Sequence, residues 1–381
     1  MIDTSKQWQF YNPVKVFVGR GSRARIVERL KNQRILIVTS VRGREQFLND
    51  SVLGAVLKNN MIVWVDSIKE APGLTDLQAE INQLKSIKVD LIIAFGGGSA
   101  IDGAKAIRMG IAANSTFTLL ELVKNTALHE SLKQVPLYAI TTTSGTGSEV
   151  TPFATIWHHE IQIKRSLVSE SVFATVAVVD AELIDSVPLT TTLFTGLDAI
   201  NQAAESIWNK NANRITMSFA MHSLKLGLSA LPLLVSGEGG QEERDQMAEA
   251  GLLAGLAISH TKTALCHSIS YPLTAHYAVP HGLACAFTMP AVYELNLFSD
   301  DGRFGEVALA LTGRQDAKLL SKVFMELNEK LEVKKIFRTY IKNWDQLMEL
   351  KNEMYAPTRV GNNLAALKEG DLDRLLKSSW Y

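Results

Sequence analysis

The N-terminal half of the chain alternates short apolar runs with segments of helical periodicity. Four such runs, each rich in β-branched residues, occupy residues 14–19, 34–40, 61–67 and 89–95. Between them, residues 22–30 and 75–87 carry apolar side chains at helical spacing. Ser22 and Thr75 are the predicted N-caps of these helices. Apolar runs of this length, separated by helices, predict a parallel sheet whose strands are buried under helices on both faces.

From about Pro188 onward the pattern changes to alanine- and leucine-rich helical segments, and no convincing strand appears. The chain has 381 residues, which exceeds what one hydrophobic core usually organises. We therefore predict an α/β plus all-α fold in two domains. Residues 1–185 would form the N-terminal parallel-sheet domain, and residues 186–381 the C-terminal helical domain.

The composition excludes several classes of function. The chain carries 39 basic and 39 acidic residues, so it has no electrostatic footprint for nucleic acid or an anionic membrane. Its two cysteines, Cys266 and Cys285, form no CxxC pair and indicate a reducing compartment. The first ten residues lack the apolar core of a signal peptide, and no apolar run reaches the roughly 18 residues of a membrane span. We expect a soluble, cytoplasmic protein without nucleic-acid or membrane partners.

Two loops that follow apolar runs are rich in residues suited to phosphate binding. The first, GGGS at residues 96–99, joins a predicted strand to a helical segment. Backbone N–H groups and the helix dipole converge at such a junction, and glycine lets a pyrophosphate approach the backbone. The second, residues 140–150, reads ITTTSGTGSEV. Either loop alone is compatible with an ordinary turn, but together they predict a dinucleotide site in a Rossmann-like domain.

The helical half contains carboxylate, amide and imidazole side chains at spacings that suit a metal site. Asp198 and Gln202 are four residues apart, which places both on one face of a helix. His267 begins a second helical segment, and His281 follows a proline in a turn. Each of the four is individually more often structural. As a set they offer the oxygen and nitrogen ligands that Fe²⁺ or Zn²⁺ accepts, which predicts a helical metal-binding domain.

Four longer motifs resemble those of the iron-containing (group III) alcohol dehydrogenases. They are GGGSAIDGAKA, TTTSGTGSEVT, GLDAINQAAES and HSISYPLTAHYAVPHG. The resemblance extends from the first predicted strand to about Asn296. It implies an N-terminal α/β domain that binds NAD(P)H and a C-terminal helical domain that holds a divalent metal, Fe²⁺ or Zn²⁺. The implied activity is hydride transfer between NAD(P)H and a small aldehyde or primary alcohol, in a homodimer.

The resemblance also assigns site residues by their positions in these motifs. The implied cofactor-binding residues are Ser40, Gly96, Gly97, Gly98, Ser99, Asp102, Thr142, Thr143, Thr146, Ser148 and Lys164. The implied metal ligands are Asp198, Gln202, His267 and His281. In this arrangement the glycines hold the pyrophosphate and Lys164 lies near the nicotinamide ribose. The metal, as a Lewis acid, stabilises the charge that develops on the substrate oxygen.

Three positions depart from the family pattern. Gln202 stands where the family usually has a histidine ligand, and Tyr271 where it usually has a further histidine. Ser40 stands where NAD-preferring members often carry an aspartate that would repel a 2′-phosphate. With Arg42 and Arg44 just beyond it, Ser40 predicts that NADPH is used at least as well as NADH. The alternative is that both arginines are solvated loop charges.

The substrate and the proton donor have candidates of their own. NQAAES, HSISYPL and residues 38–47 resemble one branch of the family, the phosphonoacetaldehyde reductases of phosphonate metabolism. An anionic substrate calls for a cation, and Lys262, five residues before His267, is a candidate, although most lysines on such a helix face solvent. The proton that completes the alcohol would come from Tyr271, from His276, or from the cofactor ribose and water. Lys262, Tyr271 and His276 are thus the predicted catalytic residues.

Two alternative functions stay open at this point. Dehydroquinate synthases and glycerol-phosphate dehydrogenases share the architecture, although VPHG and GGGSAID fit the alcohol dehydrogenases better. The other alternative is a non-enzymatic cofactor-binding or assembly protein with a degraded metal site, and Gln202 is the residue that suggests it.

Overall fold

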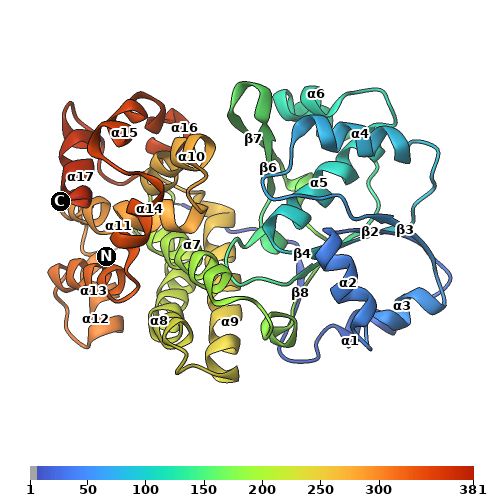
Figure 1. The fold of residues 1–381 in the computed structure, drawn as a ribbon, viewed down its shortest axis with the longest axis horizontal. Helices are drawn as coiled ribbons and strands as arrows, with labels where there is room; N and C mark the ends of the chain where they lie inside the picture. The colour runs from blue at the N-terminus through green and yellow to red at the C-terminus, as the bar shows by residue number, and fades with distance from the viewer. Residues whose placement is uncertain (1–6) are drawn as a thin grey trace. The chain divides into compact units, whose positions relative to one another are not determined.

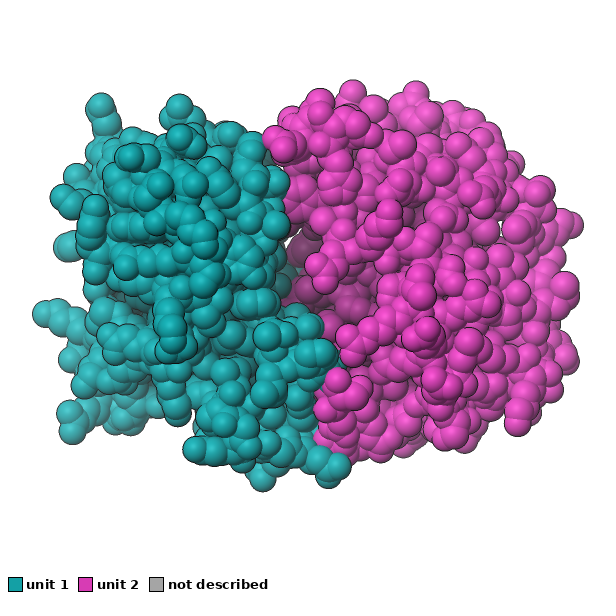
Figure 2. Space-filling model, in the orientation of Figure 1, with its two compact units in different colours: residues 1–11, 187–381 teal, residues 12–186 magenta. Residues whose placement is uncertain are grey.

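The computed structural model describes residues 7–381, and these form two compact units (Figures 1 and 2). The α/β unit comprises Asn12–Ser186, and the helical unit comprises Val187–Tyr381 together with residues 7–11. The chain thus passes between the units one residue beyond the boundary drawn from the sequence. Most of the N-terminal decapeptide that lacks a signal-peptide core lies outside the described residues.

The last described residues before Asn12 belong to the helical unit because of an aromatic contact. The Phe10 ring lies 5.8 Å from the Phe219 ring and 6.1 Å from the His260 imidazole. Both partners lie on long helices of that unit. Sequence order would place this segment with the sheet, but the ring contacts of the half-buried Phe10 attach it to the helices.

The α/β unit is built on a six-stranded sheet. In spatial order its strands are β1 (Lys15–Val18), β8 (Val176–Val179), β5 (Leu137–Thr141), β4 (Leu91–Gly96), β2 (Arg34–Val38) and β3 (Met61–Val65). Every neighbouring pair is parallel, which confirms the predicted sheet. The apolar pattern does not single out β8, whose run VAVV has only four residues.

Helices connect the strands and cover both faces of this sheet (Figure 1). They are α1 (Ala24–Val27), α2 (Val41–Asn49), α3 (Gly54–Lys58), α4 (Leu74–Leu84), α5 (Gly98–Ala113) and α6 (Leu119–Lys124), with 3₁₀ turns η1 (Thr126–Ser131), η2 (Ser148–Val150), η3 (His159–Ile161), η4 (Glu170–Val172) and η5 (Ala181–Ile184). Leu36 and Val38 of β2 belong to a hydrophobic cluster with α4 and α5. The alternate residues, Ile35 and Ile37, belong to another cluster with α1 and α2. A doubly covered strand must therefore be apolar at every position.

An antiparallel hairpin lies outside the main sheet. It consists of β6 (Phe153–His158) and β7 (Ile163–Val168). Its inward residues Ala154, Ile156 and Leu167 are buried in the same cluster as α5. The sequence of β7, IKRSLV, mixes polar and apolar residues, so its apolar pattern does not predict a strand.

Both predicted N-caps are wrong. Helix α1 begins after Arg23 rather than after Ser22, and the Asp180 carboxylate accepts the Arg23 N–H at 3.1 Å. Helix α4 begins after Gly73, and Thr75 lies in its first turn. At α1, a carboxylate from the distant end of β8 therefore performs the capping role that the sequence pattern assigns to a local serine.

The helical unit contains no strand among its described residues, as predicted. Its helices are α7 (Leu189–Ile207), α8 (Arg214–Ser236), α9 (Gln241–Thr261), α10 (Leu265–Tyr277), α11 (His281–Leu297), α12 (Arg303–Thr312), α13 (Lys318–Lys330), α14 (Val333–Tyr340), α15 (Trp344–Glu349), η6 (Lys351–Met354), α16 (Pro357–Val360) and α17 (Asp371–Trp380). Helix α7 packs against α8, α9 and α11 (Figure 1) and is buried from Gly196 to its end. Functional side chains on α7 are thereby fixed by packing on several sides.

One helix in the described part of the chain, α8, is long and apolar enough to cross a membrane by length and composition alone. Its residues Met217, Ala220, Leu224 and Leu231 are buried in the core of the helical unit. Packing against neighbouring helices accounts for its apolar character, because a core helix must be apolar on much of its surface.

Candidate active site

Two loops of the α/β unit meet at the carboxyl ends of β4 and β5. The Thr142 N–H donates to the Gly96 carbonyl at 3.0 Å, directly beyond the last paired residues of the two strands. Glycine allows the loops to touch, since a Cβ on Gly98 would lie 2.6 Å from Thr146 Cγ2. Ser148, at the end of the second loop, is buried. The two predicted phosphate-binding loops therefore form one continuous surface.

The first loop continues directly into the N-terminus of α5. Gly97 is the N-cap, and Ser99 lies in the first turn. A Cβ on Gly97 would approach Thr143 Oγ1 to 3.0 Å, and Gly96 has a φ of +149°, which favours glycine. No side chain caps this 16-residue helix, so its first N–H groups and its dipole provide a site for an anion.

A buried lysine and a buried carboxylate anchor the second loop and the hairpin to α5. Lys105 Nζ donates to the carbonyls of Thr151 and Phe153, each at 2.8 Å. The Asp102 carboxylate accepts the Thr155 N–H at 2.7 Å. Asp102, predicted to line the cofactor site, therefore lies beneath the loop and holds its exit in place.

Burial shifts the pKa values of the charged side chains beneath the second loop. Desolvation raises the pKa of Asp102, raises that of Glu149 to about 7 and lowers that of Lys105 to about 8. The positive charge of Lys164 acts against the rise in the pKa of Asp102. Lys164 lies on β7, with its Nζ 6.0 Å from the centre of the Trp157 ring.

Ser40 follows β2, the strand next to β4 in the sheet. Its Oγ accepts the Gly43 N–H at 3.1 Å and so caps α2. Arg44 is paired with Asp66 at 2.7 Å, whereas Arg42 is exposed. The carboxyl edge beside the glycine loop thus carries a neutral hydroxyl where an acid would repel a 2′-phosphate.

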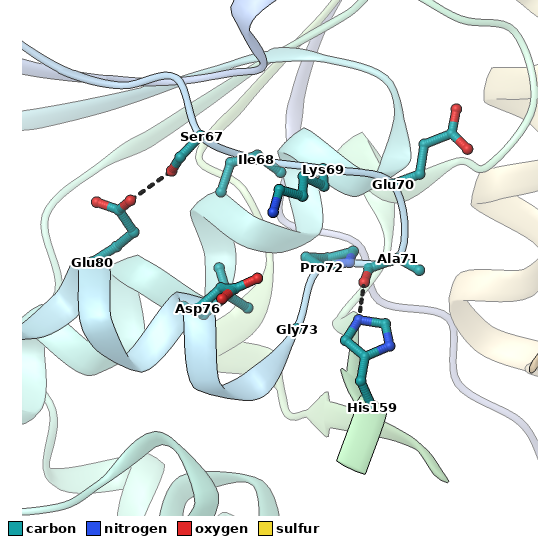
Figure 3. A pocket seen from close by; sticks show the side chains of 11 residues that line it. Ser67, Ile68, Lys69, Glu70, Ala71, Pro72, Gly73, Asp76, Glu80 and His159 are labelled. Carbon is teal, nitrogen blue, oxygen red and sulfur yellow. Dashed lines mark hydrogen bonds between the residues drawn. The ribbon is translucent and has the colours of Figure 1, made fainter. Parts of the chain in front are cut away.

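A separate depression lies where the chain passes from β3 into α4 (Figure 3). Its lining consists of residues 67–73, Asp76, Leu77, Glu80 and His159. Ser67 Oγ donates to Glu80 at 2.6 Å, and His159 Nε2 bonds the Ala71 carbonyl at 2.9 Å. The depression includes none of the predicted cofactor-binding residues, so we assign it no role.

In the helical unit, side chains from three helices converge on one point. They are Asp198 of α7, His267 of α10, and His281 and Cys285 of α11, whose potential ligand atoms all lie within 4.8 Å of one another. Nε2 of His267 and Nε2 of His281 lie 3.5 and 4.0 Å from Asp198 Oδ1. These distances are too long for ordinary hydrogen bonds. They are comparable with the spacing of ligand atoms around a metal whose bonds measure about 2.0–2.3 Å, so the residues fit a divalent ion.

Gly282 allows α11 to approach α7 closely enough to form this cluster. A Cβ at that position would lie 1.9 Å from the Phe194 carbonyl oxygen and 2.8 Å from the Asp198 nitrogen. Both are backbone atoms of α7, which cannot rotate out of the way. The glycine therefore brings His281, the first residue of α11, towards Asp198.

Glu205, which is fully buried two turns after Asp198 on α7, orients one of the imidazoles. Its carboxylate accepts the backbone N–H groups of Ala264, Cys266 and His267 at 2.7, 2.5 and 3.2 Å. The same carboxylate lies 2.7 Å from His267 Nδ1. Because an ionised carboxylate only accepts hydrogen bonds, Nδ1 carries a proton, which makes Nε2 the nitrogen available to bind a metal. Glu205 thus caps α10 and fixes the tautomer of His267.

The charges around His267 stabilise a cation at this position. Burial by itself lowers the pKa of His267, but Cys285, Glu205 and Asp198 together raise it well above its usual value. The negative charges of Asp198 and Glu205 favour a divalent ion bonded to Nε2, which agrees with the chemistry of the donor set. Burial raises the pKa of the Cys285 thiol, so this side chain is neutral until a metal binds.

The two departures from the family pattern lie near these ligands. Gln202 is buried on α7, one turn after Asp198. The Tyr271 and His281 rings are stacked, with centroids 6.1 Å apart and planes inclined by 17°. Tyr271 Oη accepts a hydrogen bond from Arg359 Nε at 3.3 Å. A phenol and a guanidinium therefore adjoin one of the predicted metal ligands.

The other two predicted catalytic residues lie elsewhere on the helical unit. Lys262 is the exposed C-cap of α9, with a φ of +61°. His276 is exposed, and its Nε2 lies 2.8 Å from a Glu353 carboxylate oxygen. Nine residues separate His276 from His267 on α10, which turns the two side chains to opposite faces of the helix. Neither residue has a recorded contact with the metal ligands in the described part of the chain, so their catalytic roles stay predictions.

The sequence motifs do not identify three further residues near the site. Glu205 follows Asp198 by seven residues, and Cys285 follows His281 by four. Both spacings place the residue on the same helix face as a predicted ligand and could have identified it. Arg359 is 88 positions from Tyr271 and carries no such signal.

Comparison with known proteins gives a consistent result along the chain. Residues 13–181 match the family described as iron-containing alcohol dehydrogenase, and residues 192–380 match the C-terminal part of the Fe-containing alcohol dehydrogenase family. The chain is 32% identical over 303 residues to the NAD-dependent methanol dehydrogenase of Bacillus methanolicus, which covers 78% of each protein. It is 27% identical over 386 residues to the NADPH-dependent butanol dehydrogenase of Clostridium saccharobutylicum, which covers 98% of each.

Comparison of the fold with solved structures agrees with the sequence comparison. The structure of sulfoacetaldehyde reductase from Bifidobacterium kashiwanohense in complex with NAD⁺ matches 98% of this chain and 99% of that one, with a TM-score of 0.88 and 26% identity. The chain belongs to the iron-containing alcohol dehydrogenase family. It is an NAD(P)- and metal-dependent alcohol dehydrogenase or aldehyde reductase, which decides against the two alternative functions.

Proposed function

We propose that the protein reduces a small aldehyde with NAD(P)H at a divalent ion, Fe²⁺ or Zn²⁺, held by Asp198, His267 and His281 with Gln202 beside them. The observation that carries the proposal is the convergence of a carboxylate and two imidazoles from three helices, at distances that suit a metal. When bound, the ion acts as a Lewis acid on the substrate carbonyl while the nicotinamide supplies the hydride.

The remaining tasks fall to residues around the ligands. Glu205 fixes the ring and the tautomer of His267 through the bond to Nδ1. Tyr271, stacked on His281, carries a phenol that donates a hydrogen bond at neutral pH. It is the predicted proton donor that lies beside the ligands, and we assign it the hydrogen bond to the developing alkoxide.

For the cofactor, we propose that the two loops beyond β4 and β5 bind the pyrophosphate and that NADPH is used at least as well as NADH. The α5 N-terminus and the glycines at its start support the first part. Ser40, which is neutral and caps α2, supports the second. Arg42 is the exposed arginine available to a 2′-phosphate, because Arg44 is paired with Asp66.

We further propose that the aldehyde carries an anionic group, with phosphonoacetaldehyde of phosphonate metabolism as the leading candidate. Arg359 bonds Tyr271, which adjoins His281, so it offers a cation near the reacting carbonyl. It replaces Lys262, whose exposed position at the end of α9 offers no such contact. The relative that reduces sulfoacetaldehyde is consistent with an anionic substrate of this size.

The first experiment combines metal analysis with NADPH and NADH oxidation in the presence of phosphonoacetaldehyde, sulfoacetaldehyde and propanal. We expect metal-dependent turnover with the highest kcat/KM for an anionic aldehyde, and loss of metal and turnover in His281→Ala. Full activity in metal-free protein would overturn the Lewis-acid role. A metal-loaded protein that reduces none of these aldehydes would overturn the function itself.

A second experiment tests the cation. Arg359→Gln removes a charge-assisted contact of about 1.5–3 kcal/mol, which corresponds to an increase in KM for the anionic aldehyde of roughly 10- to 100-fold. The KM for propanal should not change. Lys262→Gln is the matched control and should alter neither value. Equal losses for charged and neutral aldehydes in Arg359→Gln would contradict the assignment.

A further inference from the structure

Cys285 completes the cluster of donor atoms in the helical unit. It lies on α11 four residues after His281, so both side chains project from the same face of the helix. Its sulfur lies within 4.8 Å of the ligand atoms of Asp198, His267 and His281. The side chain is fully buried, yet these neighbours are an acid and two imidazoles. An ordinary core cysteine, which behaves as a small hydrophobic residue, does not require such neighbours.

The other donors leave a bound dication only partly neutralised. Asp198 supplies one negative charge, the imidazoles are neutral ligands, and the Gln202 amide adds no charge. The Glu205 carboxylate is already occupied by the N–H donors of α10 and by His267 Nδ1. The ion and these ligands would then carry one net positive charge, balanced only by the Glu205 carboxylate, which lies behind His267 and does not bond the ion. A thiolate at Cys285 would bring the net charge of the ion and its ligands to zero.

The chemistry of the two candidate donors also favours Cys285 over Gln202 as a ligand. A thiolate is a stronger ligand than a neutral amide oxygen for Zn²⁺, Co²⁺ and Fe²⁺. Gln202 occupies the position of a histidine in the family pattern, so a strong donor is missing from α7. Cys285 on α11 can supply the replacement from a different helix.

We propose, on the basis of the metal site in the proposed function, that Cys285 binds the metal as a thiolate in preference to the Gln202 amide. Binding of the ion releases the thiol proton to solvent. A carboxylate, two imidazoles and a thiolate form a softer site than an all-oxygen-and-nitrogen set, and this favours Zn²⁺ and Co²⁺ over Mn²⁺.

The test uses the full-length protein loaded with Co²⁺. A thiolate bound to Co²⁺ gives an intense charge-transfer absorption in the near ultraviolet, and oxygen and nitrogen ligands do not. We expect this band in the wild type, in Gln202→Ala and in Cys266→Ser, the control that removes the only other thiol. Cys285→Ser and Cys285→Ala should lack it, with far-ultraviolet circular dichroism confirming that they are folded.

Two further measurements are independent of the spectrum. Competition with a chelator should show a loss of Zn²⁺ affinity of at least tenfold in Cys285→Ser and a smaller loss in Gln202→Ala. In the Cys266→Ser protein, Cys285 is the single thiol, so its alkylation rate with and without Zn²⁺ reports on the native residue. We expect protection by Zn²⁺, and this measurement decides the matter if the Cys285 variants do not fold.

The outcomes separate this proposal from the proposed function. A wild-type Co²⁺ protein that reduces aldehydes without the charge-transfer band, or a band that persists in Cys285→Ser, overturns the thiolate ligand alone. Equal alkylation rates with and without Zn²⁺ do the same. Co²⁺ binding that is unaffected by His281→Ala overturns the metal site on which both proposals depend.

Discussion

Replacing Glu205 with glutamine perturbs the link between the fold and the metal ligands with little change of shape. In the wild type, Oε1 accepts the backbone N–H groups of Cys266 and His267, while Oε2 accepts the Ala264 N–H and bonds His267 Nδ1. In Glu205→Gln one of these oxygens becomes an NH₂ group. Whichever way the amide is placed, that NH₂ faces two groups that donate in the wild type, and it cannot bond either unless the imidazole changes its tautomer.

The expected effect follows from these bonds. Two hydrogen bonds to a charged acceptor are lost, each contributing about 1.5–3 kcal/mol, and a change of the imidazole tautomer can restore one of them. With one bond restored, we expect the free energy of unfolding of the metal-free protein to fall by about 1.5–3 kcal/mol. That tautomer change puts the proton of His267 on Nε2, where it blocks metal binding. Metal affinity should then fall by roughly 10- to 100-fold, which is usual for loss of the group behind a histidine ligand.

Urea unfolding of the metal-free proteins measures the first effect, and chelator competition with Zn²⁺ measures the second. Glu353→Gln is the matched control, because Glu353 bonds the exposed His276 on the other face of α10. An exposed pair contributes little, so this control should stay within about 0.5 kcal/mol of the wild type and keep its metal affinity. If Glu205→Gln behaves like Glu353→Gln in both assays, Glu205 neither caps α10 nor orients His267, and the reasoning is refuted.

Four other substitutions test separate parts of the structure. The raised pKa of Glu149, about 7 in the folded protein, means that the native state binds this proton more tightly than the unfolded chain. Glu149 should therefore lower wild-type stability by about 3 kcal/mol as the pH rises from about 4.5 through about 7. Urea unfolding at the two ends should show a fall smaller by that amount in Glu149→Gln, where Asp102, whose pKa is also raised, still titrates. Gly282→Ala, whose Cβ would lie 1.9 Å from the Phe194 carbonyl oxygen, should lower both the Tm and the metal content, measured by calorimetry and metal analysis. Ser40→Asp should shift the ratio of kcat/KM values towards NADH, and a wild type that ignores NADPH would contradict the reading of that loop. Tyr271→Phe should lower kcat with an unchanged metal-to-protein ratio. Loss of metal in this variant would contradict the role proposed for Tyr271.

The parallel sheet is predictable because its cause is local in sequence. A strand covered on both faces must be apolar at successive positions, and the runs that become β2 and β4 satisfy this requirement. The glycine loop is also predictable from the sequence, since the conformation of Gly96 and the close approach of Gly98 to Thr146 leave no room for a side chain. The hairpin of β6 and β7 cannot be predicted in this way, because β7 is stabilised by pairing with β6 and by contacts with α6, and not by its own apolar pattern.

Helical spacing in the sequence predicts part of the active site. Asp198 and Gln202 share a face of α7 because they are four residues apart, and Glu205 follows from the same period. The period says nothing about which faces of different helices meet. It leaves Lys262 and His276 as plausible as Tyr271, although only Tyr271 stacks on His281.

The sequence alone therefore determined the two-part architecture, the glycine loop and the candidate ligands within each helix. Tertiary structure decided which of those candidates come together. Gly282 sets how closely α11 approaches α7, the Glu205 carboxylate binds the start of α10, and these contacts bring Cys285 to His267 and Asp198. Such contacts depend on burial and packing summed over several helices, whereas periodicity records only the orientation of each helix about its own axis.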